Sequence, residues 1–313
     1  MKIGYKFLEY CIAKNRRLEI ATRLSSNPNY SVTKLIIQKI RVFVAYLVFT
    51  VVSLGDLRAS KKVTKKRKNK YCGKTALVIA GGPSANNLDV EVVISAQRNN
   101  ELDVFAMNWF THTPLANQLT PDFYVLSDPI NRVNREGTFK SRNSNQIWDV
   151  LSTWKETKLI VPHYWRADLK YMNKEVVMYI DDRELIGFTR SILPTKPRGY
   201  SSLTALKTLA AAIYMGYREI YVIGLDGTAF KSLYVTKENL VYEGNNNLAD
   251  SDETPGVLRS DGWPNGVSDM LYAHSHEFLD IKRCFHDKRI INLNLDSMHD
   301  GIMKSVASKY TKN

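Results

Sequence analysis

Cysteine, glycine and proline are scarce in this chain, and their scarcity excludes several classes of protein. The three cysteines, Cys11, Cys72 and Cys284, show no CxxC spacing, so neither a disulfide framework nor a zinc site is predicted. With 16 glycines and 10 prolines in 313 residues, the chain lies far below the level of low-complexity proteins. We therefore expect a folded protein from a reducing compartment.

A long apolar run is also missing. The longest uncharged stretch near the N-terminus covers residues 42–55, whereas a transmembrane helix needs about 20 apolar residues. Lys39 and Arg41 can extend their stems along such a helix and lengthen its apolar part. The stretch starts too far from Met1 for a signal peptide and has no small-residue cleavage site after it. Whether residues 35–55 span a membrane or lie on it stays open.

Acidic residues are scarce in the first part of the chain. Residues 1–74 hold 18 Lys or Arg and only three acids, whereas the rest of the chain is close to neutral. Nine of these bases lie between residues 58 and 74, beside the apolar stretch. Each base near an anionic membrane contributes about 1 kcal/mol, so residues 35–74 are predicted to bind an anionic membrane surface. The alternative is a solvated linker after a core helix. Because the basicity is confined to this part, nucleic-acid binding is not expected.

From residue 75 onward, apolar runs typical of strands alternate with helical patterns. Helices are predicted near residues 88–98, 201–217 and 275–286, and strands near 75–79, 103–107, 122–127, 158–161, 176–180, 219–226 and 289–293. This alternation predicts an α/β fold, with a mostly parallel sheet covered by helices on both faces. The ligand crevice of such folds lies outside the carboxyl ends of the strands. We expect two parts, an N-terminal helical extension over 1–74 and one domain over 75–313.

Glycine and polar residues follow several of the predicted strands. The first strand runs into Gly81, Gly82, Pro83 and Ser84, a turn without GxGxxG or GxxxxGKS spacing. A glycine turn can bring backbone N–H groups close to a phosphate, and it can equally serve tight packing alone. Three further strands end at polar side chains that can cap a helix or contact a ligand: Asn108, Asp128 and Asp226.

The order of these motifs resembles the bacterial sialyltransferases of glycosyltransferase family 42. The resemblance covers about residues 75–293. It is carried by Ile79-Ala80-Gly81-Gly82-Pro83-Ser84, Met107-Asn108-Trp109-Phe110, the stretch from Gly216-Tyr217-Arg218 to Gly224-Leu225-Asp226, and Ala273-His274-Ser275 followed by Asp280-Ile281-Lys282. The resemblance implies a Rossmann-like fold of the GT-A-like type and an inverting transfer from CMP-sialic acid that needs neither a metal nor a cofactor.

The same resemblance implies roles for individual residues. His274 would be the catalytic base, with His276 as the alternative, because imidazole titrates near working pH. Tyrosines would stabilise the phosphate of the departing CMP, and the candidates lie in or beside a lid-like loop over about residues 227–272: Tyr234, Tyr242 and Tyr272. The nucleotide sugar would contact Gly81, Gly82, Pro83, Ser84, Asn108, Ser201, Ser202 and Asp226, and Asp128 stands where the family has asparagine.

The predicted function is transfer of a sialic-acid-like or Kdo-like sugar from a CMP-linked donor to a glycan, a lipid-linked glycan or a lipopolysaccharide precursor. The expected place is the cytoplasmic face of a bacterial inner membrane, with peripheral or monotopic attachment. An exposed apolar helix can also serve as an interface between copies of the chain. Two alternatives remain. One is a magnesium-dependent pterin pyrophosphokinase-like enzyme that uses Asp128 and Asp226, and the other is a non-catalytic nucleotide-binding scaffold at the membrane.

Overall fold

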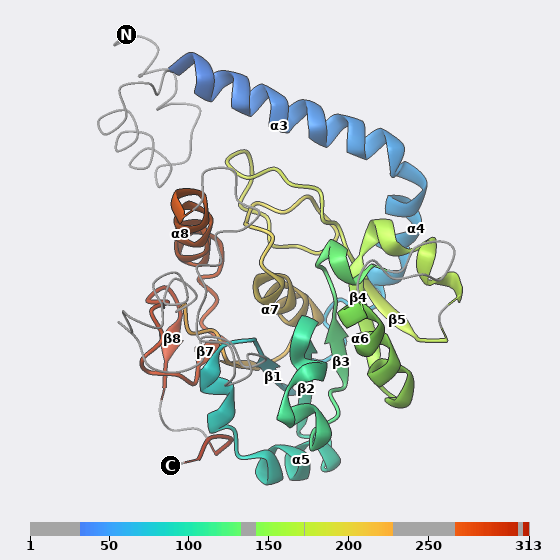
Figure 1. Ribbon diagram of the computed structural model, residues 1–313, viewed down its shortest axis with the longest axis vertical. Helices are drawn as coiled ribbons and strands as arrows, with labels where there is room; N and C mark the ends of the chain where they lie inside the picture. Colours follow the sequence, from blue (N-terminus) through green and yellow to red (C-terminus); the bar gives the residue numbers. More distant parts are fainter. Residues whose placement is uncertain (1–31, 133–141, 172, 228–266, 306–308, 313) are drawn as a thin grey trace.

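The computed structural model describes residues 32–132, 142–171, 173–227, 267–305 and 309–312 (Figure 1). Short apolar runs form one sheet of eight parallel strands in the order β5-β4-β3-β2-β1-β6-β7-β8. The predicted α/β fold with a parallel sheet is therefore confirmed. The strands are β1 Thr75–Ile79, β2 Leu102–Met107, β3 Phe123–Val125, β4 Lys158–Pro162, β5 Val176–Ile180, β6 Glu219–Ile223, β7 Ile290–Asn292 and β8 Met303–Lys304.

Helices cover both faces of the sheet, because successive strand residues point into two separate apolar cores. Ala76 and Val78 of β1 pack in the core with α7, whereas Leu77 and Ile79 pack in the opposite core. Such double burial explains why the strands read as continuous apolar runs. The helices are α3 Val32–Val52, α4 Leu54–Lys65, α5 Val90–Arg98, α6 Arg142–Thr153, α7 Thr204–Met215 and α8 Val267–Cys284.

The strand order reverses between β1 and β6. The chain builds the sheet outward from β1 to β5, returns through α7 and places β6 on the other side of β1. In open parallel sheets, ligands bind outside the carboxyl ends of the strands at this point of reversal. Short 3₁₀ turns follow four of the strands at this edge: η1 Pro83–Asn87 after β1, η2 Asn108–His112 after β2, η4 Pro129–Asn131 after β3 and η5 His163–Trp165 after β4.

The predicted start of the last helix needs correction. α8 begins at Val267, eight residues before the predicted start, because the apolar pattern continues through Met270 and Leu271. α6 and β8 were not predicted. The remaining short turns of the described chain are η3 Pro114–Asn117 and η6 Asp168–Tyr171.

The basic segment after residue 54 packs against the sheet. Leu57 and Thr64 of α4 are buried, and the Thr64 hydroxyl donates to the carbonyl of Tyr179 at 2.8 Å while accepting from its N–H at 3.0 Å. Arg67 pairs with Glu175 just before β5, at 3.0 Å. The part of the predicted extension from residue 54 to 74 therefore contacts the edge strand β5 directly.

No single helix within the described residues has both the length and the apolar character needed to cross a membrane. The pair formed by Lys39–Val52 and Leu54–Lys65 meets the test jointly, with a bend of 81° between its two parts.

Candidate functional site at the carboxyl edge of the sheet

The turn after β1 is bonded directly to the end of β6. The Ser84 hydroxyl donates to Asp226 Oδ1 at 2.5 Å, and the Ser84 N–H donates to Asp226 Oδ2 at 3.0 Å. Ser84 Oγ also accepts from the N–H of Gly224 at 2.9 Å, and Asn294 donates to Asp226 Oδ1 at 2.7 Å. Both side chains are buried, with exposed fractions of 9% and 4%. Ser84 and Asp226, predicted as separate donor-binding residues, form one buried pair across the point of reversal.

Close packing explains the glycine at position 82. A Cβ there would lie 2.4 Å from Asp226 Oδ2 and 2.6 Å from the carbonyl oxygen of Gly224. The Gly82 N–H donates to that carbonyl at 2.8 Å. The N–H groups of Gly82 and Ser84 therefore bond within the protein, so the predicted phosphate cradle is not built from these two groups. Gly81 is the exposed residue of the turn, next to the half-buried Pro83.

Gly82→Ala is expected to destabilise the protein by about 1–3 kcal/mol, because its Cβ would be forced into backbone and a buried carboxylate. Chemical denaturation measures the effect. Gly55→Ala is the matched control, since a Cβ there meets no atom within 4 Å. Equal unfolding free energies for the two variants would contradict the packing explanation.

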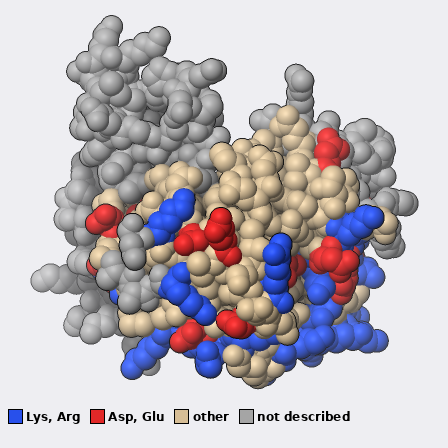
Figure 2. Space-filling view, turned by 90° about the horizontal axis from the view of Figure 1, so that it is seen from below, with Lys and Arg blue, Asp and Glu red and all other residues tan. Residues whose placement is uncertain are grey.

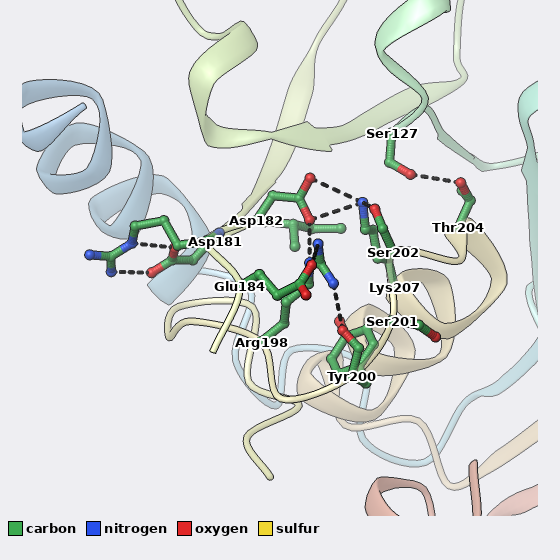
Figure 3. Close-up of polar contacts among 12 residues, drawn as sticks. Ser127, Asp181, Asp182, Glu184, Arg198, Tyr200, Ser201, Ser202, Thr204 and Lys207 are labelled. Carbon is green, nitrogen blue, oxygen red and sulfur yellow. Dashed lines mark hydrogen bonds and ion pairs between the residues drawn. The ribbon is translucent and has the colours of Figure 1, made fainter. Parts of the chain in front are cut away.

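A second polar group joins the ends of β2 and β3 to the start of α7. Asn108 adopts a left-handed backbone conformation with φ +45°, which asparagine tolerates better than most residues. Its Nδ2 donates to Thr204 Oγ1 at 3.0 Å, and Thr204 Oγ1 lies 2.6 Å from Ser127 Oγ (Figure 3). Asn108 Oδ1 is buried and has no hydrogen-bond partner among the described residues. This oxygen is a buried acceptor that a ligand donor can satisfy.

A buried lysine reaches the same edge from α7. Lys207 is fully buried, and its Nζ donates to Ser202 Oγ at 2.9 Å and lies 2.9 Å from Asp182 Oδ1. Arg198 donates to the same carboxylate at 2.8 Å and pairs with Glu184, as Figure 3 shows. Burial lowers the pKa of Lys207, whereas the charge of Asp182 raises it. The segment between β5 and α7, which carries Ser201 and Ser202, is therefore tied to α7 by an ion network.

α8 is bonded to the same segment. The N–H of Ser201 donates to Asp280 Oδ2 at 2.7 Å, and Asp280 lies in α8. The predicted base His274 lies six residues earlier in this helix, one turn before Phe278, and Tyr272 lies in it too. The side chains of His274 and Tyr272 fall outside the described parts of the molecule. Tyr234 and Tyr242 also lie outside them, with most of the predicted lid-like loop.

Several site residues were missed from the sequence. Lys207 could have been found from the sequence, since it is the lone charged residue in the mostly apolar helix α7. His299 gave no such signal. It is buried, its ring lies 4.5 Å from that of Phe278, and burial lowers its pKa. Asp128 is half-buried after β3. Burial lowers the pKa of Lys207, and the charge of Asp128 opposes that lowering only weakly. Within the described residues, no three His, Cys, Asp or Glu side chains are grouped to hold a metal ion.

Comparisons with known proteins give little beyond this geometry. No protein-family model matches the chain, and no curated protein matches it. A solved structure, the MAf glycosyltransferase from Magnetospirillum magneticum AMB-1, is similar with a TM-score of 0.44 and 14% sequence identity. The similarity covers 82% of this chain and 39% of that one, so the chain spans about two-fifths of the length of that protein. So distant a likeness does not assign an activity, and membership of the sialyltransferase family stays a prediction.

Proposed function

We propose that the protein is an inverting glycosyltransferase that moves an acidic sugar, sialic-acid-like or Kdo-like, from a CMP-linked donor to a glycan acceptor. The acceptor is a lipid-linked glycan or a lipopolysaccharide precursor at the cytoplasmic face of a bacterial inner membrane. No metal or cofactor takes part in this proposal. The motif order from Ile79 to Lys282 and the polar groups at the carboxyl edge of the sheet support it.

The observation that carries the proposal is the buried acceptor of Asn108. Its Oδ1 lies at the end of β2, beside Thr204 and near the strand reversal where parallel sheets bind nucleotides. Leaving such an oxygen without a donor costs about 1–3 kcal/mol, so a ligand that supplies one gains binding energy. The amino group of cytosine and the hydroxyls of ribose are donors of this kind. The proposal therefore assigns Asn108 to the cytidine nucleotide.

The transfer forms one bond and breaks another. The acceptor hydroxyl oxygen attacks the anomeric carbon of the sugar from the face opposite the phosphate, which inverts the configuration. The bond from that carbon to the phosphate oxygen breaks, and CMP leaves with the electron pair. His274 takes the hydroxyl proton as general base, with His276 as the alternative.

The charge of the departing phosphate needs stabilisation. The ammonium of Lys207 is buried, and it donates a hydrogen bond to the hydroxyl of the exposed Ser202. The first turn of α7 has no side-chain cap, and its N–H dipoles favour an anion at the same edge. In this proposal Ser201 and Ser202 contact the phosphate, with Tyr234, Tyr242 and Tyr272 as further donors from the loop and α8.

The pyrophosphokinase alternative needs Asp128 and Asp226 as magnesium ligands. Both oxygens of Asp226 already accept hydrogen bonds from Ser84, and one accepts from Asn294. These bonds and the burial of the carboxylate restrict its access to a metal ion, which weighs against the alternative. The assay of CMP release distinguishes the other alternative, because a non-catalytic scaffold would release no CMP.

The test is release of CMP from CMP-sialic acid and CMP-Kdo by the full chain, with glycan acceptors, with and without EDTA. We expect turnover of one donor that EDTA does not abolish. Asn108→Gly should weaken CMP binding about tenfold or more, because it removes the acceptor oxygen at a position whose φ of +45° glycine adopts without strain. The exposed Asn117→Gly is the control. No turnover of either donor would refute the proposal, and magnesium-dependent consumption of ATP would favour the kinase.

A further inference from the structure

The helix α3 has two faces of different character. Its inward side chains recur every three or four residues and contact the body of the protein. Lys39 donates to the carbonyl of Ile186, Thr50 accepts from Arg183, and Phe49 packs on the ring of His163 at 5.4 Å. These contacts fix the orientation of α3 on the segments after β4 and β5.

The opposite face of α3 is apolar and exposed. Ten of the fifteen exposed large hydrophobic side chains in the described residues lie between positions 36 and 54. The most exposed are Val51 at 75% and Val52 at 79%, and the others are Ile36, Ile37, Ile40, Phe43, Val44, Leu47, Val48 and Leu54. Their spacing places them on about half of the helix surface. An apolar stripe of this length on a fixed helix marks a docking surface.

The surroundings of this stripe are basic. The described residues from 32 to 74 contain twelve Lys or Arg and one acid, Asp56. Arg41 and Arg58 are exposed beside the stripe, and further exposed bases follow along α4 and beyond it: Lys62, Lys65, Lys66, Lys68 and Lys70. The face of the molecule opposite α3 is different, since Lys and Arg there are mixed with Asp and Glu (Figure 2).

We propose that α3 docks in the plane of an anionic membrane surface, with its apolar stripe in the headgroup and acyl boundary and its inward face on the protein. An amphipathic helix lying in the interface needs an apolar face flanked by bases, and α3 with the start of α4 has both. A second copy of the chain is the less suitable occupant. Two such basic surfaces repel each other, whereas anionic headgroups attract them.

The bend after α3 limits which bases reach the lipid. α4 turns away by 81° and runs down beside β5, as Figure 1 shows. A helix of its length extends about 18 Å from the end of α3, beyond the Debye length of about 8–10 Å. Arg67 and Lys74 are engaged by Glu175 and Asp103. The apolar stripe with Arg41 and Arg58 is therefore the main contact, and the basic run from 65 to 74 is secondary.

Flotation of the full chain with vesicles tests this inference. The vesicles are phosphatidylcholine alone, or phosphatidylcholine with phosphatidylglycerol. We expect binding to the anionic vesicles that falls at least tenfold in Val44→Glu/Val48→Glu, and also falls in Arg41→Glu/Arg58→Glu or at high salt. The control is Leu193→Glu/Leu295→Glu, which changes two exposed leucines elsewhere and should bind like the unchanged chain. Circular dichroism checks that all variants are folded.

Three outcomes would overturn the inference. The first is undiminished flotation of Val44→Glu/Val48→Glu. The second is a change from dimer to monomer in this variant, by light scattering, without loss of flotation, which would assign the stripe to a second copy. The third is resistance to carbonate extraction from anionic vesicles, which would indicate a span. None of these readouts depends on transferase activity. Point variants are preferred to deletion of residues 1–74, because that deletion also removes α4 from β5.

Discussion

Asp182→Ala is expected to destabilise the protein by about 3–5 kcal/mol, because it leaves two buried cations without their shared partner. Lys207 is fully buried, and its Nζ lies 2.9 Å from the Asp182 carboxylate. Arg198 donates to the same carboxylate at 2.8 Å. Removing the carboxylate keeps the desolvation cost of both charges and loses their attraction. Chemical denaturation, monitored by tryptophan fluorescence, measures the loss.

Glu184→Ala is the matched control for this change. Glu184 also accepts from Arg198 at 2.8 Å, but its side chain is 45% exposed, so its loss should cost less than about 1 kcal/mol. Adding Lys207→Met to Asp182→Ala should recover part of the stability, because the unpaired ammonium is then removed. Similar losses for Asp182→Ala and Glu184→Ala would show that the network contributes no more than a surface pair.

His274→Ala is expected to lower the rate of sugar transfer by about 10²–10⁴-fold, the usual contribution of a general base. Binding of CMP should be unchanged, because the proposed contacts of the nucleotide are with Asn108 and the start of α7 rather than with this histidine. The rate is measured as CMP release with donor and acceptor at saturation, and CMP binding by calorimetry.

Two histidines serve as comparisons. His286 follows α8 and is exposed, so His286→Ala should transfer sugar at the rate of the unchanged protein. His276→Ala separates the two candidates for the base. If His274→Ala keeps full activity and His276→Ala loses it, the base is His276; if both keep full activity, the base lies elsewhere.

The fold was predictable wherever burial alone sets the pattern. β1, β5 and α5 were found because uninterrupted apolar runs, or one clear amphipathic stripe, fix the element. α6 was missed, since its apolar residues Ile147, Trp148 and Leu151 span barely one turn in a polar sequence. β8 has two residues, too few to show a period.

Only the residues that directly follow predicted strands could be assigned to the site from the sequence. Asn108 and Asp226 were expected at one edge because parallel strands share their direction. The contacts within that edge were not predictable. Lys207 and Asp182 are separated by 25 residues, and only the docking of α7 on the sheet brings them together. Asn294 and His299 come from the end of the chain, where no sequence pattern connects them with Asp226.

The hydroxyl of Thr64 has a consequence for the solubility of the folded protein. β5 is the outer strand on its side, and open strands are templates on which other chains aggregate. Thr64 occupies both the N–H and the carbonyl of Tyr179, and Arg67 donates to the carbonyl of Val177 at 3.4 Å, so α4 and the turn after it cover part of this open edge. The outer strand on the other side, β8, is two residues long. Neither end of the described sheet offers a long open ladder on which a misfolded copy can grow.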